Sequence, residues 1–349
     1  MEIEQVYKTE VIGLAQYIQK NTSDIYCQMV SNLDACRTTF SLQKLKTKFQ
    51  NEMNLDEQTI HDSDQTNLTA TEHAKRERVK YKQATIEHRK DQWASKSLHG
   101  QHRLLVSQSQ IDEELSYNWL KSSDLKPETE GFLIAAQDQA LRTKYYSKKI
   151  LGQDCDGKCR MCHVCNETVD HLMSGCPVLA ANDYTWRHDR IGKYIHLQLC
   201  KHFGIETPTN KWYQYEPPQV VESEEVTILW DVPITTDREI NCNRPDIVVK
   251  KKSTKSCLFI DFAVPCDRNV SLKEREKLDK YRDLKLEVER MWHTKVDIVP
   301  VVVGATGLAK RGVLKHIEKI PGHVSFDMIQ KIALLDTAHI LRKCLNESY

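Results

Sequence analysis

The sequence carries almost no net charge and no long apolar run. Its 349 residues include 50 Lys and Arg against 49 Asp and Glu, so a protein that binds nucleic acid through its overall charge is excluded. Any phosphate-binding surface must therefore be local. No stretch reaches the roughly 18 apolar residues of a membrane-spanning helix, and the N-terminal MEIEQVYKTEVIGL is too polar and acidic for a secretion signal. We expect a non-membrane protein in a reducing compartment.

Cysteine, by contrast, is abundant and clustered. In a reducing compartment, a tight group among the 12 Cys indicates metal binding rather than disulfides. Three thiolates and one imidazole have the spacing of a tetrahedral zinc site: Cys159, Cys162, His171 and Cys176. In a competing set, Cys165 replaces Cys159, with His163 or Cys155 as weaker substitutes. Four protein ligands leave no open position, so the sequence predicts a structural zinc ion.

The length fits two or three domains at about 150 residues each, and the pattern changes along the chain. Residues 1–70 are expected to be poorly ordered or irregular, and the stretch 50–74 is expected to be a polar linker. A helix is predicted over 71–91. We divide the chain into an irregular segment, a helical connector, a zinc module with the helix that follows it, and a strand-rich domain: 1–70, 71–150, 151–205 and 206–349.

The strand-rich domain has β-branched runs of strand length at 226–230, 246–249, 257–264 and 296–304. A helical pattern over 271–292 separates the last two runs and predicts a crossover between parallel strands. Helices are also predicted over 113–121 and 133–150 in the connector, after the Cys cluster, and near the C-terminus. The fold class is therefore α+β overall, with a helical N-terminal part and a C-terminal α/β domain.

Two carboxylates mark adjacent strands of that domain. Asp246 follows Pro245 at the start of one strand, and Asp261 lies inside the next, FIDFAV. An ionised Asp in such apolar surroundings is costly unless it is paired or metal-bound. Two convergent carboxylates suit Mg²⁺, and a lysine beside them would orient water or neutralise phosphate. The candidates are Lys277 and Lys280. Alternatively, all of these are ordinary turn, core and surface residues.

These segments carry a resemblance. RPDIVV, FIDFAV and EKLDKYRDL, in this order, resemble the PD-(D/E)xK nuclease pattern in the variant found in site-specific non-LTR (LINE-type) retrotransposons. CRMCHVCNETVDHLMSGC, followed by YTWRHDRIGKYIHLQLC, is similar to the CCHC zinc knuckle and Arg-His-Asp segment of the same polyproteins. The match spans about residues 90–345. It departs from the pattern at Ala263, where the common motif has Lys, and the chain has no Tyr/Phe-x-Asp-Asp polymerase signature.

The resemblance implies a restriction-like endonuclease domain with a mixed central sheet flanked by helices. It selects the zinc ligands that begin at Cys159, and it implies a Mg²⁺ site at Asp246 and Asp261 with Lys277 or Lys280 as the catalytic lysine. The nucleic-acid contacts it suggests, together with the basic turn between the two strands, are Arg187, His188, Lys250, Lys251, Lys252 and Lys255.

The expected function is therefore Mg²⁺-dependent nicking of DNA, as in target-primed reverse transcription, by a retroelement-derived protein. Its partner would be DNA, with RNA as an alternative partner of the zinc knuckle. Its location would be nuclear if it acts on chromosomal DNA and cytoplasmic otherwise. The competing hypotheses are a catalytically inactive nucleic-acid-binding module and a folded relic of the polyprotein.

Overall fold

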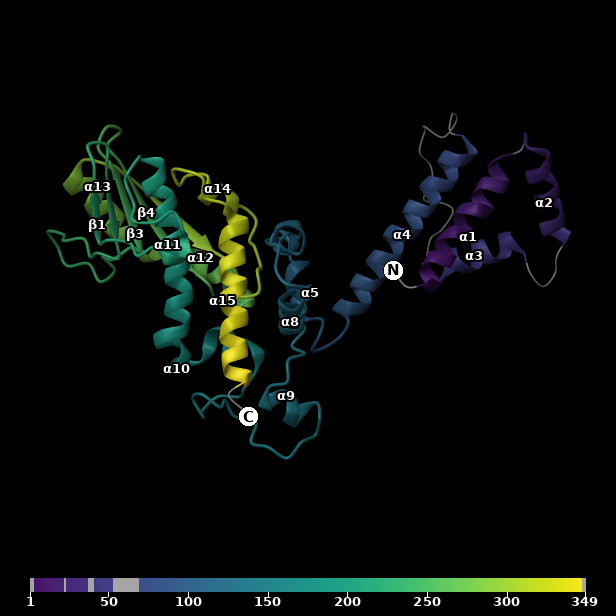
Figure 1. Cartoon of the computed structure of the whole chain (residues 1–349), viewed down its shortest axis with the longest axis horizontal. Helices are drawn as coiled ribbons and strands as arrows, with labels where there is room; N and C mark the ends of the chain where they lie inside the picture. Colours follow the sequence, from purple (N-terminus) through teal and green to yellow (C-terminus); the bar gives the residue numbers. More distant parts are fainter. Residues whose placement is uncertain (1–2, 22, 37–40, 53–68, 347–349) are drawn as a thin grey trace. The chain divides into compact units, whose positions relative to one another are not determined.

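The computed structural model describes residues 3–21, 23–36, 41–52 and 69–346. The chain divides into two compact units, Met1–Lys96 and Ser97–Tyr349, whose elements are labelled in Figure 1. The segments that we separated as connector, zinc module and strand-rich domain are therefore packed together from Ser97 onward. Among the described residues, no helix combines the length and the apolar character that crossing a bilayer requires.

The first unit is helical, in contrast to the irregular segment expected over 1–70. Its helices are α1 (Ile3–Lys20), α2 (Ile25–Cys36), α3 (Leu42–Asn51) and α4 (Ala70–Ala94). Apolar side chains of three helices form a small core, including Ile12, Phe49 and Tyr81, which offsets the polar composition. Thr69 and Glu72 cap α4 reciprocally, which confirms the helix predicted there. Most of the expected linker, residues 53–68, lies outside the described residues.

The second unit contains a five-stranded sheet in the order β1-β2-β3-β4-β5. The strands are β1 (Val220–Glu222), β2 (Val226–Trp230), β3 (Ile247–Lys251), β4 (Ser256–Ala263) and β5 (Lys295–Val302). The first four pair antiparallel, and β5 is parallel to β4. The α+β class and the mixed sheet are thus confirmed. The short β1 had no signal in the sequence analysis.

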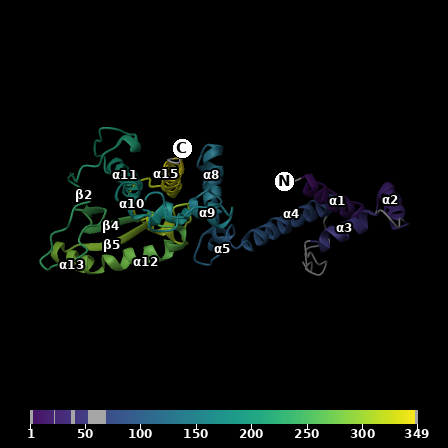
Figure 2. The same ribbon diagram turned by 90° about the horizontal axis from the view of Figure 1, so that it is seen from below.

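Helices cover both faces of the sheet, because β4 alternates its side chains between them. Leu258, Ile260 and Phe262 pack in the core that includes α11 (Thr185–His202) and α15 (Phe326–Asn346). Cys257 and Phe259 pack on the other face, against residues of α13 (Arg282–Trp292). Figure 2 shows α12 (Val270–Lys280) and α13 along one side of the sheet, with α11 and α15 on the other.

Three predicted helices are broken. The helix expected over 113–121 is interrupted at Asn118, which separates two short helices. The crossover helix expected over 271–292 is interrupted at Tyr281, which separates α12 from α13. The helix expected over 133–150 instead ends at Gln137, and the chain turns through Gln139 with a positive φ of 55°. The connector helices are α5 (Gln101–Val106), α6 (Glu113–Tyr117), α7 (Trp119–Ser122), α8 (Pro127–Gln137) and α9 (Lys144–Lys149).

The remaining helical segments are short. The zinc-module segment contains the π-helices η3 (His171–Gly175) and η4 (Ala180–Tyr184), which flank α10 (Pro177–Leu179). The 3₁₀-helix η5 (Trp212–Gln214) precedes the sheet, η6 (Asp267–Asn269) follows β4, and α14 (Val313–Ile317) precedes α15. The first three lead into α11, whereas η5, η6 and α14 each lie between a strand and a helix that covers the sheet.

Candidate functional site

Four metal-ligating side chains converge at the start of the zinc-module segment. The ligand atoms of Cys159, Cys162, His171 and Cys176 all lie within 4.8 Å of one another. Cys159 Sγ is 4.0 Å from Cys176 Sγ, and Cys162 Sγ is 3.4 Å from His171 Nε2. Zinc–thiolate bonds of about 2.3 Å place two sulfur atoms of a tetrahedral site about 3.8 Å apart. The donor set and spacing therefore fit a zinc ion.

The structure distinguishes the two ligand sets considered above. Cys165 is exposed and outside the cluster, whereas Cys159 and Cys176 are buried. The Cys165 carbonyl instead accepts a hydrogen bond from the Cys159 amide, at 2.8 Å. Burial raises the pKa of the Cys159 thiol to about 11, so a thiolate there requires a compensating cation. Zinc would provide that compensation.

The cluster is joined to the rest of the second unit by a buried ion pair. The Arg160 guanidinium binds both oxygens of the fully buried Glu167 carboxylate, at 2.8 and 2.9 Å. It also donates to the carbonyls of Cys344 and Leu345 at the end of α15. Cys159 and Cys176 lie in one apolar cluster with Leu341 and other residues of α15. The loop that carries the candidate ligands is therefore part of the packing of this unit, as expected for a structural site.

The two candidate carboxylates lie at one end of the β3–β4 hairpin. Ile247 pairs with Ile260, so Asp246, directly before β3, and Asp261, the next residue of β4, lie at the same end of the hairpin. The Phe262 amide donates to Asp246 Oδ2 at 2.9 Å, which ties the residue before β3 to β4. Asp261 is fully buried in β4, whereas the Asp246 side chain is 18% exposed. One carboxylate is therefore internal and the other opens to solvent.

Lys277 is the nearer of the two candidate lysines. Its ammonium forms an ion pair with Asp261 Oδ2, while Lys280 Nζ is 3.7 Å from Oδ1. Lys280 instead donates to the hydroxyl of Tyr281, at 2.6 Å. That hydroxyl lies 2.5 Å from Asp261 Oδ1, and its ring is fully buried. Sequence reasoning missed Tyr281, although its place in EKLDKY, directly after Lys280, was a usable signal.

Asp246 is contacted from the opposite layer by His188. The imidazole Nε2 is 3.2 Å from Asp246 Oδ2, and Nδ1 is 3.0 Å from Asp189 Oδ1. Burial opposes the charge on His188, but the two carboxylates outweigh it and raise the pKa of the imidazole to about 9. Burial likewise opposes ionisation of Asp246, but His188 and the charge of Lys277 outweigh it and lower its pKa. Both groups are charged at neutral pH.

An open cleft of about 440 Å³ lies at this carboxylate. The aromatic residues Tyr184, Trp230 and Phe262 line it together with His188 and Asp246. Trp230 and Phe262 are stacked, with ring centroids 6.2 Å apart. The cleft thus places a carboxylate beside aromatic side chains, of which Phe262 is itself 1% exposed.

The expectation that Arg187 contacts nucleic acid is wrong. Its side chain is 1% exposed and donates to Thr337 Oγ1, the Met173 carbonyl and the Val264 carbonyl. Burial lowers the pKa of its guanidinium to about 10. Adjacent residues on a helix point about 100° apart, so Arg187 faces the interior while His188 faces the cleft.

The basic turn lies at the far end of the same hairpin. Lys251 pairs with Ser256, five residues along β4 from Asp261, which is roughly 16 Å at 3.3 Å per residue. Lys250 lies over the Trp292 ring at 4.4 Å, and Lys252 binds Glu222 at 2.8 Å. The structure therefore does not bring Lys250, Lys251, Lys252 and Lys255 to the carboxylates.

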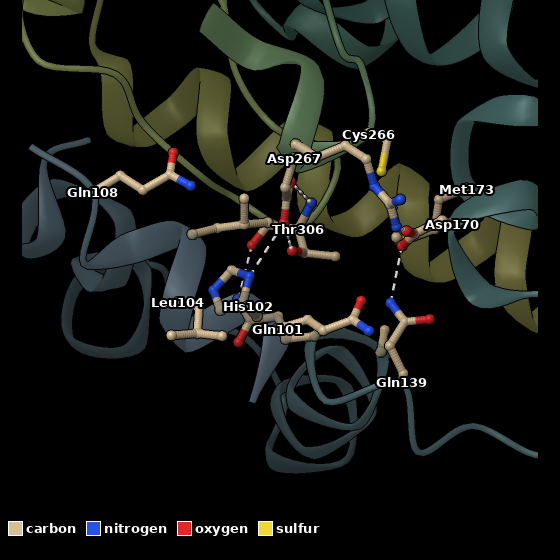
Figure 3. Close-up of a pocket in the computed structure, with 14 residues that line it drawn as sticks. Gln101, His102, Leu104, Gln108, Gln139, Asp170, Met173, Cys266, Asp267 and Thr306 are labelled. Carbon is tan, nitrogen blue, oxygen red and sulfur yellow. Dashed lines mark hydrogen bonds and ion pairs between the residues drawn. The ribbon is translucent and has the colours of Figure 1, made fainter. Parts of the chain in front are cut away.

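A second cavity of about 280 Å³ lies between α5 and the loop after β5. In Figure 3, His102, Asp267 and Thr306 are turned toward one another at one side of it, and Gln139 reaches Asp170 at the other. His102 Nδ1 is 3.3 Å from Asp267 Oδ2, and the Thr306 amide donates to Asp267 Oδ1 at 3.1 Å. These contacts join the connector to η6 and to the sheet.

The sequence matches no protein-family model and no curated protein. The functional assignment therefore rests on the residues and geometry of the chain itself.

Proposed function

We propose that this protein is a metal-dependent DNA endonuclease of the PD-(D/E)xK kind, derived from a retroelement, with a structural zinc module. One observation carries the proposal: a carboxylate of β4, a second directly before β3 and a lysine from the following helix lie at one end of a mixed sheet. Asp261 forms an ion pair with Lys277, and Asp246 directly precedes Ile247 of β3, which pairs with Ile260 of β4. This juxtaposition of residues far apart in sequence is more specific than any one of them.

Asp246 and Asp261 would hold a Mg²⁺ ion, which lowers the pKa of a bound water and stabilises charge on the phosphorane. The donor chemistry fits, because Asp261 Oδ2 is buried, beside a single ammonium and without a hydrogen bond among the described residues. Lys277 is 17% exposed, so its ammonium can hold the scissile phosphate or the attacking water. The cleft beside Asp246 would receive the nucleotide next to the cut.

The zinc module would hold the ends of this unit together rather than take part in the reaction. Arg160 binds Glu167 and the last carbonyls of α15, so the ligating loop fixes the helix that covers the sheet. We expect nucleic acid to meet the cleft face, with DNA as the substrate and RNA as an alternative partner of the zinc module.

The test is nicking of supercoiled plasmid in Mg²⁺ by the zinc-loaded chain. Asp261→Asn should abolish nicking, because a neutral amide holds the cation poorly and leaves Lys277 without its counter-charge. The matched control is Asp297→Asn, on β5 opposite Leu258, which should nick like the wild type. Equal activity in the wild type and Asp261→Asn would refute the assignment.

A catalytically silent nucleic-acid-binding module is the second candidate. The contacts of Asp261 favour this candidate. Lys277 neutralises the carboxylate and the Tyr281 hydroxyl donates a hydrogen bond to it, so the carboxylate is satisfied without a metal ion. This alternative predicts DNA binding that weakens steeply with salt and no nicking in any divalent metal. Binding measured by fluorescence anisotropy beside the plasmid assay separates the two candidates.

A further inference from the structure

The imidazole of His188 is held by contacts within the chain. Both of its ring nitrogens are occupied from within the chain, by Asp189 on Nδ1 and Asp246 on Nε2. The ring also packs against Phe262 of β4, with centroids 4.4 Å apart and planes tilted by 39°. A histidine that binds a phosphate group needs one ring nitrogen without a partner in the chain. Here the imidazole is fixed on three sides, by two carboxylates and an aromatic ring.

The backbone of α11 determines this placement. Gly192 lies one helical turn after His188, on the same face. A Cβ at Gly192 would overlap both the Phe262 and the Trp230 side chains, so only glycine lets the helix approach the sheet this closely. The distance between His188 and Asp246 is therefore set by helix packing, and it does not depend on an adaptable surface side chain.

The two carboxylate oxygens of Asp246 differ in their contacts. Oδ2 accepts the hydrogen bond of the Phe262 amide and also faces His188 Nε2. A carboxylate oxygen offers about two lone-pair sites, so these two donors occupy Oδ2 fully. Oδ1 is then the oxygen left for a ligand. Such outer contacts commonly orient the carboxylates that bind metals.

We propose that His188 is a positioning residue that holds Asp246 by Oδ2 and leaves Oδ1 to bind the divalent cation. The inference rests on the proposed function and adds to it a residue that acts through Asp246. Loss of the imidazole lets the carboxylate rotate, which weakens the cation site and slows the chemical step. The affinity for DNA should be unchanged, because both ring nitrogens of His188 are already engaged by carboxylates of the chain.

The experiment compares Mn²⁺ binding and nicking in the zinc-loaded full chain. Mn²⁺ is titrated by electron paramagnetic resonance, and Asp246→Asn identifies the binding that belongs to this site. His188→Ala should bind Mn²⁺ about tenfold more weakly there and lower kcat, with the KM for plasmid unchanged. His188→Gln, whose amide can still donate to Oδ2, should recover most of both. His202→Ala, an exposed histidine on the same helix, is the matched control and should behave like the wild type.

The possible failures are distinguishable. Wild-type Mn²⁺ affinity in His188→Ala overturns the positioning role and leaves the proposed function standing. A raised KM for DNA with unchanged kcat also overturns it, because it identifies His188 as a nucleic-acid contact. If Asp246→Asn removes no Mn²⁺ binding from the chain, the cation site itself is refuted. In that case the proposed function and the inference both fall.

Discussion

Exchanging Cys159 or Cys165 for serine tests the zinc ligand set directly. Both residues are cysteines of one short loop, but only Cys159 is buried among the converging ligands, while Cys165 is exposed. Cys159→Ser should therefore lose zinc, whereas Cys165→Ser should keep one zinc per chain. The pair forms a matched comparison, because each variant removes one thiol from the same segment.

The expected size of the effect follows from linkage. A ligand that binds only the folded state at about 1,000 times its Kd stabilises it by about 4 kcal/mol. For a unit of this size, 1 kcal/mol changes Tm by about 2–4 °C, so Cys159→Ser should lower Tm by roughly 8–16 °C. Cys165→Ser alters an exposed side chain, and its effect should stay within about 0.5 kcal/mol.

Zinc per chain is measured by atomic emission after dialysis against metal-free buffer, and Tm by calorimetry at a fixed free zinc concentration. A chelator should lower the Tm of the wild type and of Cys165→Ser to that of Cys159→Ser. If Cys159→Ser retained zinc, or Cys165→Ser lost it, the ligand set derived from the structure would be wrong. Equal Tm in the zinc-bound wild type and in zinc-free Cys159→Ser would refute the stabilising role of zinc.

Three further predictions concern the packing around the site. Burial holds the pKa of His196 at about 4, so the unfolded chain takes up a proton between about pH 6.5 and 4 that the folded chain does not. The free energy of unfolding should therefore fall by roughly 3 kcal/mol as pH drops through that range, and urea titrations of His196→Asn should show a flatter profile. Arg187→Met removes the donor to three buried acceptors and should destabilise the protein by roughly 2–5 kcal/mol in urea; a loss of DNA affinity without loss of stability would contradict its internal role. Gly192→Ala should cost about 1–3 kcal/mol through overlap with the sheet, although helix propensity alone favours alanine by about 1 kcal/mol; a higher Tm would show that the sheet can yield.

Local pattern was sufficient for most of the larger unit. The β-branched runs and the helical spacing between them predicted β2 to β5 and the crossover, because alternation and helical period follow from backbone geometry. The mixed sheet was implied by the family resemblance. The same reasoning from local pattern failed for α1, α2 and α3. Charged and amide residues interrupt the apolar pattern there, and α1 and α3 are stabilised by packing with Tyr81 of α4, which is distant in sequence.

The sequence alone determined which residue types are available and which can reach one another: three thiolates and an imidazole within one short loop, and two carboxylates on adjacent strands. Only the tertiary structure determined which of two residues close in sequence takes part in each site. It buried Cys159 and exposed Cys165, paired Lys277 with Asp261, and turned Arg187 inward while His188 met Asp246. Spacing limits reach, but burial and direction depend on the elements that pack on either side, and these come from distant parts of the chain.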